Sequence, residues 1–249
     1  MRSRKTFIRV LLKQLASVFG VAMAIHWTAP AGAQERVAIE LIFGVDTSIS
    51  VSGYEFQLQM QGMADTFRDP AVVAAIKAQP GGVAVALFQW SGTPNANYLI
   101  GWHRLHNAAS IHAFASEIER ADRDPGQGFT ALGNAIDFAT SQLLSNRFAG
   151  EKLKIDISGD GRSNNGLAPD SARQHAERQN VTVNGLPILT DVEDLDHYFR
   201  EQVIAGPGAF VEVARDYWSF AAAFRRKLLR ELNPHISRLD RKLRAAALR

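Results

Sequence analysis

The sequence predicts an α/β fold with a doubly wound, mostly parallel six-stranded sheet and helices on both faces. Strand-like and helix-like segments alternate along most of the 249 residues, as they do in chains of βαβ units. Several strand-like segments are near-continuous apolar runs, which is typical of strands buried on both faces. No internal repeat or long linker divides residues 34–233. We therefore predict one domain over this range.

In the first half of the chain, three strands and two helices are expected. The run Val37–Val45 is apolar and rich in β-branched residues, which predicts the first buried strand. A capping-box pattern that begins at Ser52 predicts a helix ending near Arg68. Apolar patterning and turn residues predict the remaining elements of this half, which are strands at 83–90 and 98–102 and a helix at 108–121.

The second half continues the same alternation. A helix is expected at 130–146, because Leu132, Ile136 and Leu143 share one helical stripe. The other expected elements are a strand at 153–158, a helix at 169–179, a strand at 181–189, a helix at 195–204, a strand at 210–213 and a helix at 217–232.

Charge is unevenly distributed along the chain, although the formal total is only +3. Residues 1–33 hold five basic and no acidic residues, for +5. Residues 34–214 hold 13 basic and 22 acidic residues, for −9, and residues 215–249 hold ten basic and three acidic residues, for +7. A nucleic-acid-binding protein lines a folded face with positive charge, so this distribution argues against nucleic acid as a partner. The lack of cysteine excludes disulfides, zinc thiolate centres and a thiol nucleophile.

The first 33 residues have the three-part pattern of a secretory signal. Basic residues lead into the apolar stretch Leu15–Trp27, and Ala31-Gly32-Ala33 then offers small residues for cleavage. We predict cleavage after Ala33 and a periplasmic or secreted location. The alternative is an uncleaved anchor, but a spanning helix needs roughly 20 apolar residues, and this stretch is shorter.

A candidate metal site follows the first predicted strand. Asp46, Ser48 and Ser50 have i, i+2, i+4 spacing at its carboxyl end, where open α/β sheets bind ligands. One carboxylate and two hydroxyls form a hard oxygen donor set suited to Mg²⁺, Mn²⁺ or Ca²⁺. The alternative is that the serines only cap a helix.

Two more oxygen-bearing side chains are expected at the same edge of the sheet. Thr130 stands where a glycine-containing loop meets a predicted helix, and Asp160 follows the predicted strand at 153–158. If segment 98–102 returns antiparallel, the elements after it bring both residues to the edge where Ser50 lies. The alternative for Asp160 is a plain turn residue.

This combination of motifs resembles the von Willebrand factor A (vWA) type of Rossmann-like domain with a metal-ion-dependent adhesion site (MIDAS). That site uses D-x-S-x-S, found here at 46–50, a threonine in a second loop and an aspartate ending the fourth strand, which correspond to Thr130 and Asp160. The resemblance covers most of 37–232 in element order. The S-G-D-G element and segments 184–188 and 220–232 are also similar to a bacterial exported subgroup of unknown function.

The resemblance implies roles for the five residues and a function. Ser48 and Ser50 would bind the metal directly, Thr130 directly or through water, and Asp46 and Asp160 largely through water or hydrogen bonds. The implied activity is binding, in which Mg²⁺, or alternatively Mn²⁺ or Ca²⁺, accepts an Asp or Glu from a protein partner. No general base or nucleophile is evident nearby, so we predict that the chain is not an enzyme. The alternatives are a metal-dependent hydrolase or phosphatase that uses Asp46 and Asp160, and a scaffold with a vestigial site.

The segment 234–249 raises a separate question. Ile236, Leu239 and Leu243 share one face of a helix that is otherwise rich in basic residues. Such a basic amphipathic helix can contact an anionic membrane surface or an acidic partner. The alternatives are a frayed end or packing against the acidic domain.

Overall fold

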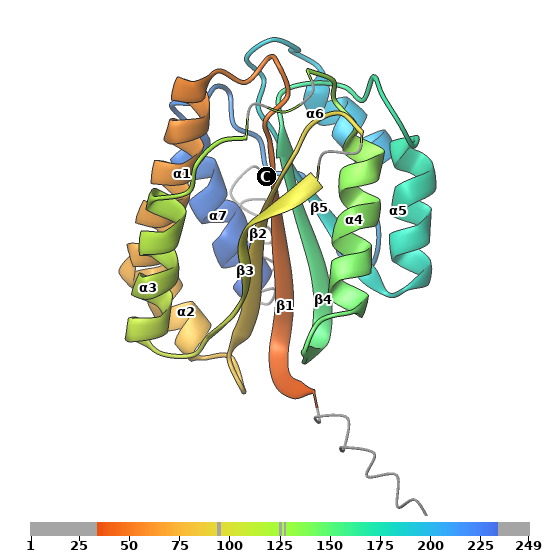
Figure 1. Ribbon diagram of the computed structural model, residues 1–249. Coiled ribbons are helices and arrows are strands. Elements are labelled where there is room, and N and C mark those ends of the chain that lie inside the picture. The colour runs from red at the N-terminus through yellow and green to blue at the C-terminus, as the bar shows by residue number, and fades with distance from the viewer. Residues whose placement is uncertain (1–33, 94–95, 125, 127, 234–249) are drawn as a thin grey trace, which may run out of the picture. The chain divides into compact units, whose positions relative to one another are not determined.

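The central feature is a five-stranded sheet with strand order β3-β2-β1-β4-β5 (Figure 1). The computed structural model describes residues 34–93, 96–124, 126 and 128–233. Neighbouring strands are parallel, except that β3 runs antiparallel to β2. The strands are β1 (Glu35–Asp46), β2 (Val83–Trp90), β3 (Ala96–Leu105), β4 (Phe148–Gly159) and β5 (Val181–Pro187).

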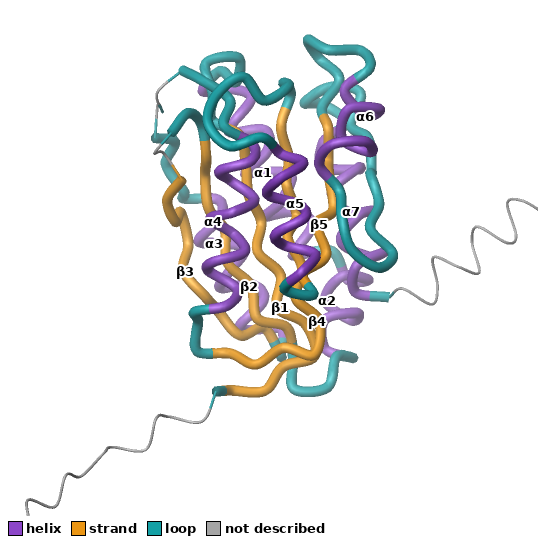
Figure 2. Tube along the Cα trace, turned by 90° about the vertical axis from the view of Figure 1, so that its right-hand side faces the viewer, coloured by secondary structure: helices purple, strands orange, loops and turns teal. Residues whose placement is uncertain are grey.

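Helices cover both faces of this sheet, and one hydrophobic core lies on each side (Figures 1 and 2). One face carries α1 (Gly53–Arg68), α2 (Pro70–Lys77), α3 (Ala108–Glu119) and α7 (Phe220–Leu232). The other carries α4 (Leu132–Leu144), α5 (Pro169–Arg178), α6 (Leu195–Tyr198) and the π-helical turn Phe199–Val203. The predicted α/β class with a mostly parallel sheet is confirmed.

Two helix starts show how local sequence sets the fold. The predicted capping box is present, because Ser52 Oγ accepts from Glu55 N at 3.2 Å and Ser52 N donates to the Glu55 carboxylate at 2.8 Å. Helix α2 was not predicted. Asp69 caps it by accepting from the backbone N–H of Ala71 and Val72, and Pro70 occupies its first turn, which is a favoured arrangement at helix starts.

The sixth strand predicted at 210–213 is wrong in detail. This segment runs beside β5 but forms only isolated parallel bridges, at Gly185–Val211 and Ile188–Ala214. The backbone N–H of Phe210 donates to the side-chain oxygen of Asn184 at 3.1 Å rather than to a neighbouring strand. Backbone hydrogen bonds still join the segment to β5, from Gly185 N to the Phe210 carbonyl and from Glu212 N to the Gly185 carbonyl. The ladder is broken between the two bridges at Pro187, which has no N–H to donate.

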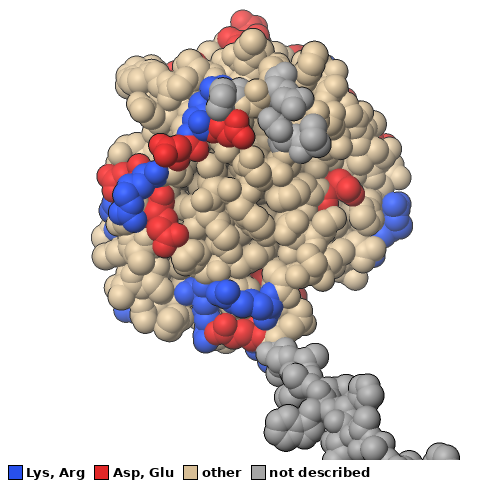
Figure 3. Space-filling model, viewed as in Figure 1, with Lys and Arg blue, Asp and Glu red and all other residues tan. Residues whose placement is uncertain are grey.

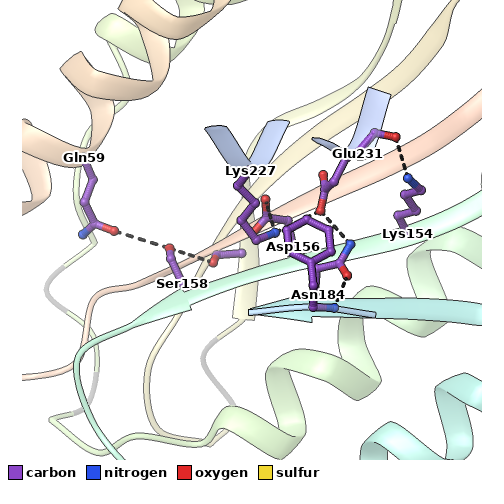
Figure 4. A network of polar contacts seen from close by, with 9 residues as sticks. Gln59, Lys154, Asp156, Ser158, Asn184, Lys227 and Glu231 are labelled. Carbon is purple, nitrogen blue, oxygen red and sulfur yellow. Dashed lines mark hydrogen bonds and ion pairs between the residues drawn. The ribbon is translucent and has the colours of Figure 1, made fainter. Parts of the chain in front are cut away.

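Helix α7 is fixed to the sheet by buried charges (Figure 4). The fully buried Lys227 Nζ lies 2.6 Å from Asp156 Oδ2 on β4 and 2.9 Å from Glu231 Oε1. Asn184 on β5 donates to Glu231 at 2.7 Å, and Lys154 Nζ donates to the Glu231 backbone carbonyl at 2.7 Å. Burial raises the pKa of Asp156 to about 7, against the attraction of Lys227. These contacts specify one position for α7 on the sheet.

The described part of the chain carries a net negative charge. Residues 34–233 hold 18 basic and 24 acidic residues, for −6. On the face shown in Figure 3, the charged side chains gather along one side and at the lower edge. Among the described helices, none combines the length and apolar character needed to cross a membrane. The predicted signal at 1–33 and the predicted basic helix at 234–249 lie outside the described residues.

Candidate metal centre

The site begins where the central strand β1 ends. Asp46 and Ser48 are buried, and Asp46 Oδ1 accepts a 2.7 Å hydrogen bond from the Ser48 backbone N–H. This tight turn carries the chain out of the sheet between β2 and β4, the two neighbours of β1. The connections after β1 and β4 lead to helices on opposite faces, so their carboxyl ends border the crevice in which open α/β sheets bind ligands.

Hydroxyl and carboxylate groups from two strand ends meet at this crevice. Ser48 Oγ and Ser50 Oγ are 3.1 Å apart, and Ser50 Oγ donates to Asp160 Oδ1 at 2.8 Å. Asp160 follows β4, which pairs with β1 in parallel up to Val45 and Ser158. Four of the five predicted residues are therefore linked by a continuous chain of hydrogen bonds.

Thr130, the fifth residue, lies beside the loop that carries Asp160. Its backbone N–H donates to Asn164 Oδ1 at 2.9 Å, and Asn164 N donates back to the Thr130 carbonyl at 2.9 Å. A Cβ placed on Gly161 would lie 3.8 Å from Thr130 Oγ1. The structure thus brings all five predicted residues to one edge of the sheet; their role as metal ligands stays a prediction.

The electrostatics of the site favour a bound cation. Asp46 is fully buried, and its Oδ2 atom has no hydrogen-bond partner within the described part of the chain. Burial, with a further contribution from the charge of Asp160, raises the pKa of Asp46 to about 7. Burial also raises the pKa of Asp160. A cation between the two carboxylates would offset both costs, because an opposite charge favours the ionised form.

The donor set fits a hard divalent ion. Of the residues that the structure describes, no three His, Cys, Asp or Glu side chains converge as a metal-binding group. This edge instead combines two carboxylates with three hydroxyls, and ions such as Mg²⁺ and Ca²⁺ take oxygen ligands. Because Mg²⁺ usually keeps several waters, two carboxylates are enough for such a site.

Tyr217, which sequence reasoning missed, supports the site by holding the Asp160 carboxylate. It lies just before α7, is buried, and its hydroxyl donates to Asp160 Oδ2 at 2.9 Å. With Ser50 on the other oxygen, both carboxylate oxygens of Asp160 are held in place. Burial beside Asp160 and Asp46 raises the pKa of Tyr217, so it remains a donor at neutral pH. No local motif marks this residue, which is 57 positions from Asp160.

Arg123, also missed, holds the loop that carries the serines. Its Nη2 atom donates to the backbone carbonyls of Thr47 at 3.0 Å, Ser48 at 3.3 Å and Val51 at 2.8 Å. One guanidinium therefore bonds three carbonyls of this turn, of which that of Ser48 also accepts from the backbone N–H of Val51 at 3.0 Å. Arg123 falls in the predicted break at 122–128, where the only available signal was loop composition.

A side chain at the end of β4 would crowd the Asp46 carboxylate. A Cβ placed on Gly159 would lie 3.0 Å from Asp46 Oδ2 and 3.2 Å from the Trp90 ring. Both distances are tighter than ordinary contacts. The absence of a side chain at this position leaves room for the Asp46 carboxylate.

Solved structures with the same fold have been determined for several proteins. Proximal thread matrix protein 1 (PTMP1) from the mussel byssus matches with a TM-score of 0.60 at 15% identity, over 79% of this chain and 48% of its own. A von Willebrand factor type A protein from Catenulispora acidiphila gives 0.54 at 20% identity, over 79% and 43%. The pilus adhesin SpaC from Lactobacillus rhamnosus GG gives 0.57 at 13% identity, over 78% and 30%.

These matches define the class of protein. The fold is that of a vWA-like domain. The chain spans less than half the length of these solved chains. No curated protein matches the sequence. The chain belongs to the family described as "Protein of unknown function (DUF1194)", whose model matches residues 36–236.

Proposed function

We propose that this chain is an exported, metal-dependent binding module that presents a divalent cation to an Asp or Glu side chain of a protein partner. The observation that carries the proposal is the buried Asp46 Oδ2 atom, which has no hydrogen-bond partner among the described residues, beside the hydrogen-bonded hydroxyls of Ser48 and Ser50. A buried, unpaired carboxylate oxygen costs free energy, and a cation is the natural group to offset that cost.

Each residue has a distinct part in the proposed site. Ser48, Ser50 and Thr130 would offer neutral oxygen ligands, and Asp46 and Asp160 would hold the ion largely through water and hydrogen bonds. When bound, the ion supplies a positive charge that few direct protein charges neutralise, so it attracts a carboxylate from outside. Mg²⁺ is the proposed ion, and Mn²⁺ and Ca²⁺ are the alternatives.

Two comparisons support a binding role rather than catalysis. One structure of the mussel protein is described as having a zinc-occupied MIDAS motif, at 14% identity and a TM-score of 0.57, over 80% of this chain and 48% of its own. The SpaC structure is described as a pilus adhesin. A similar structure with zinc in its MIDAS motif and a similar structure described as an adhesin both favour metal-dependent adhesion for this chain.

Export is the second part of the proposal. It rests on the signal-like pattern of residues 1–33, with cleavage after Ala33 leaving a domain over 34–233 and a basic segment at 234–249. The module would then act in the periplasm or outside the cell. Amino-terminal sequencing of the chain recovered from outside the cytoplasm tests this directly; a start at Gln34 is expected, and recovery only of the uncut chain in membranes would contradict it.

Calorimetric titration of Mg²⁺ into the full chain tests the metal site. We expect binding heat for the wild type and at least about tenfold weaker binding for Ser48→Ala, as is typical when metal-site residues are lost. Ser145→Ala is the matched control, because Ser145 bonds only within its own helix end, to the Ser141 carbonyl. The absence of heat with Mg²⁺, Mn²⁺ and Ca²⁺, or equal affinity in Ser48→Ala, would reject the proposal.

A further inference from the structure

The most exposed large apolar side chains belong to the segments that form the proposed metal site or contact them. Seven large hydrophobic residues are exposed among those that the structure describes, and the four with the largest exposed fractions are Ile49 at 81%, Trp218 at 72%, Tyr54 at 56% and Phe129 at 55%. We call these four residues the apolar rim. Exposed apolar groups that gather in one place mark interaction sites.

Each member of the rim is tied to the site by the chain itself. Ile49 stands between the two serines of the motif, and Phe129 immediately precedes the motif threonine. Trp218 follows Tyr217, whose hydroxyl bonds Asp160. Tyr54 lies in the first turn of α1 and contacts Trp218, with ring centroids 5.7 Å apart at 63°. Three separate segments, the connection from β1 into the first turn of α1 and the residues before α4 and α7, therefore place apolar side chains at the same edge.

The rim is not explained by the packing of the domain. None of its four residues belongs to the hydrophobic cores on either face of the sheet. Tyrosine and tryptophan lose little side-chain entropy on binding and are enriched at interaction hot spots. The edge-to-face contact between Tyr54 and Trp218 restrains both rings before any partner arrives.

The charges near the site restrict what can dock there. The described domain carries −6, and the charge of Asp191 acts unfavourably on Asp160. A carboxylate from a partner therefore meets repulsion unless a cation is bound. A purely acidic ligand would also leave the apolar rim in water.

Resting on the proposed function, we infer that the partner is a protein segment in which one Asp or Glu is flanked by aromatic or aliphatic side chains. The carboxylate binds the ion, and the flanking side chains cover the rim. Such a segment complements both the charge of the occupied site and the apolar groups around it. An anionic lipid surface would match the ion but would be repelled by the acidic domain.

Peptide selection tests this inference. Random dodecapeptides displayed on phage are panned against the full chain in Mg²⁺ and released with EDTA. We expect the released sequences to share an Asp or Glu with an apolar residue close on either side. A representative peptide should bind Trp218→Ser and Ile49→Ser about tenfold more weakly than the wild type, while both variants keep wild-type Mg²⁺ affinity.

Leu144→Ser is the matched control, because Leu144 is 47% exposed but lies at the far end of α4 from Thr130. It should bind the peptide as the wild type does. Acidic peptides without apolar neighbours, or full affinity in Trp218→Ser, would reject the rim while leaving the metal-dependent function intact. Release of no peptide by EDTA would reject both. Rim-dependent dimerisation in Mg²⁺ would show that a second copy of the chain is the occupant and overturn the inference.

Discussion

Replacement of Asp46 by asparagine removes the buried charge on which the proposed site depends. In the metal-free protein the pKa of Asp46 is raised from 3.8 to about 7, first by burial and then by Asp160. Between these two values the folded state holds a proton that the unfolded chain has released. Stability therefore falls as pH rises through this window and is greatest on its acid side.

The size of the effect follows from the change in pKa. One pKa unit corresponds to about 1.4 kcal/mol, so the rise at Asp46 corresponds to roughly 4 kcal/mol over the whole window. Asparagine does not titrate. Any constant effect of its amide on the free energy of unfolding cancels when the pH dependence of that free energy is compared between the two proteins. The wild type should therefore lose up to about 4 kcal/mol more than Asp46→Asn between acidic and neutral pH.

The assay is urea unfolding in EDTA across a pH series, repeated in Mg²⁺. In Mg²⁺ the wild type should gain more stability at neutral pH than Asp46→Asn does, because ligand binding to the folded state stabilises the wild type and the variant has lost a site carboxylate. Asp122→Asn, at an exposed position, is the control and should follow the wild type in both buffers. Parallel stability curves for wild type and Asp46→Asn in EDTA would refute the reasoning.

Three further substitutions probe the surroundings of the site. Lys227→Met should lower the free energy of unfolding by about 3–5 kcal/mol in urea titrations, and more at alkaline than at acidic pH, because the pKa of Asp156 is already raised to about 7. Tyr217→Phe should cost about 1 kcal/mol and weaken Mg²⁺ binding about tenfold by calorimetry, since Asp160 loses a donor. Arg123→Met should cost about 2 kcal/mol and speed hydrogen exchange in the loop after β1.

Each of these substitutions has a matched control on the surface. Lys77→Met and Arg120→Met change exposed residues at helix ends, and Tyr98→Phe removes a hydroxyl that bonds Gln142 rather than the site. A pH-independent loss in Lys227→Met would contradict the account of the buried charges. Wild-type Mg²⁺ affinity in Tyr217→Phe, or unchanged exchange in Arg123→Met, would show that these residues do not support the site.

Local sequence was sufficient to predict the elements that a continuous apolar run or a capping motif marks. The apolar run that begins at Val37 became β1, and the capping box at Ser52 began α1 where expected. Segment 210–213 was misjudged because it does pair with β5, but only at isolated bridges, since Pro187 of β5 has no N–H to continue the ladder. Which residue of β5 lies opposite the segment depends on tertiary packing and leaves no pattern within the segment itself.

The residues of the candidate site also fall into those that the sequence could predict and those that it could not. Asp46 and Asp160 could be placed at one edge because each ends a strand, and parallel neighbouring strands end together. Tyr217 and Arg123 could not, since they act on residues 57 and 72–76 positions away. Contacts of that separation are fixed by how helices pack on the sheet and not by any short motif.

The directions of β1 and α7 determine how this domain can be tethered. The chain enters β1 at Glu35 and runs 12 residues to Asp46, a span of about 36 Å. Helix α7 leads back from the Tyr217 side to Leu232, whose carbonyl accepts from Gln79, near the start of β2, at 3.0 Å. Both ends of the described domain thus lie at the edge remote from the crevice. A tag, a support or a neighbouring domain joined at either end would leave the binding edge facing outward and open to a partner.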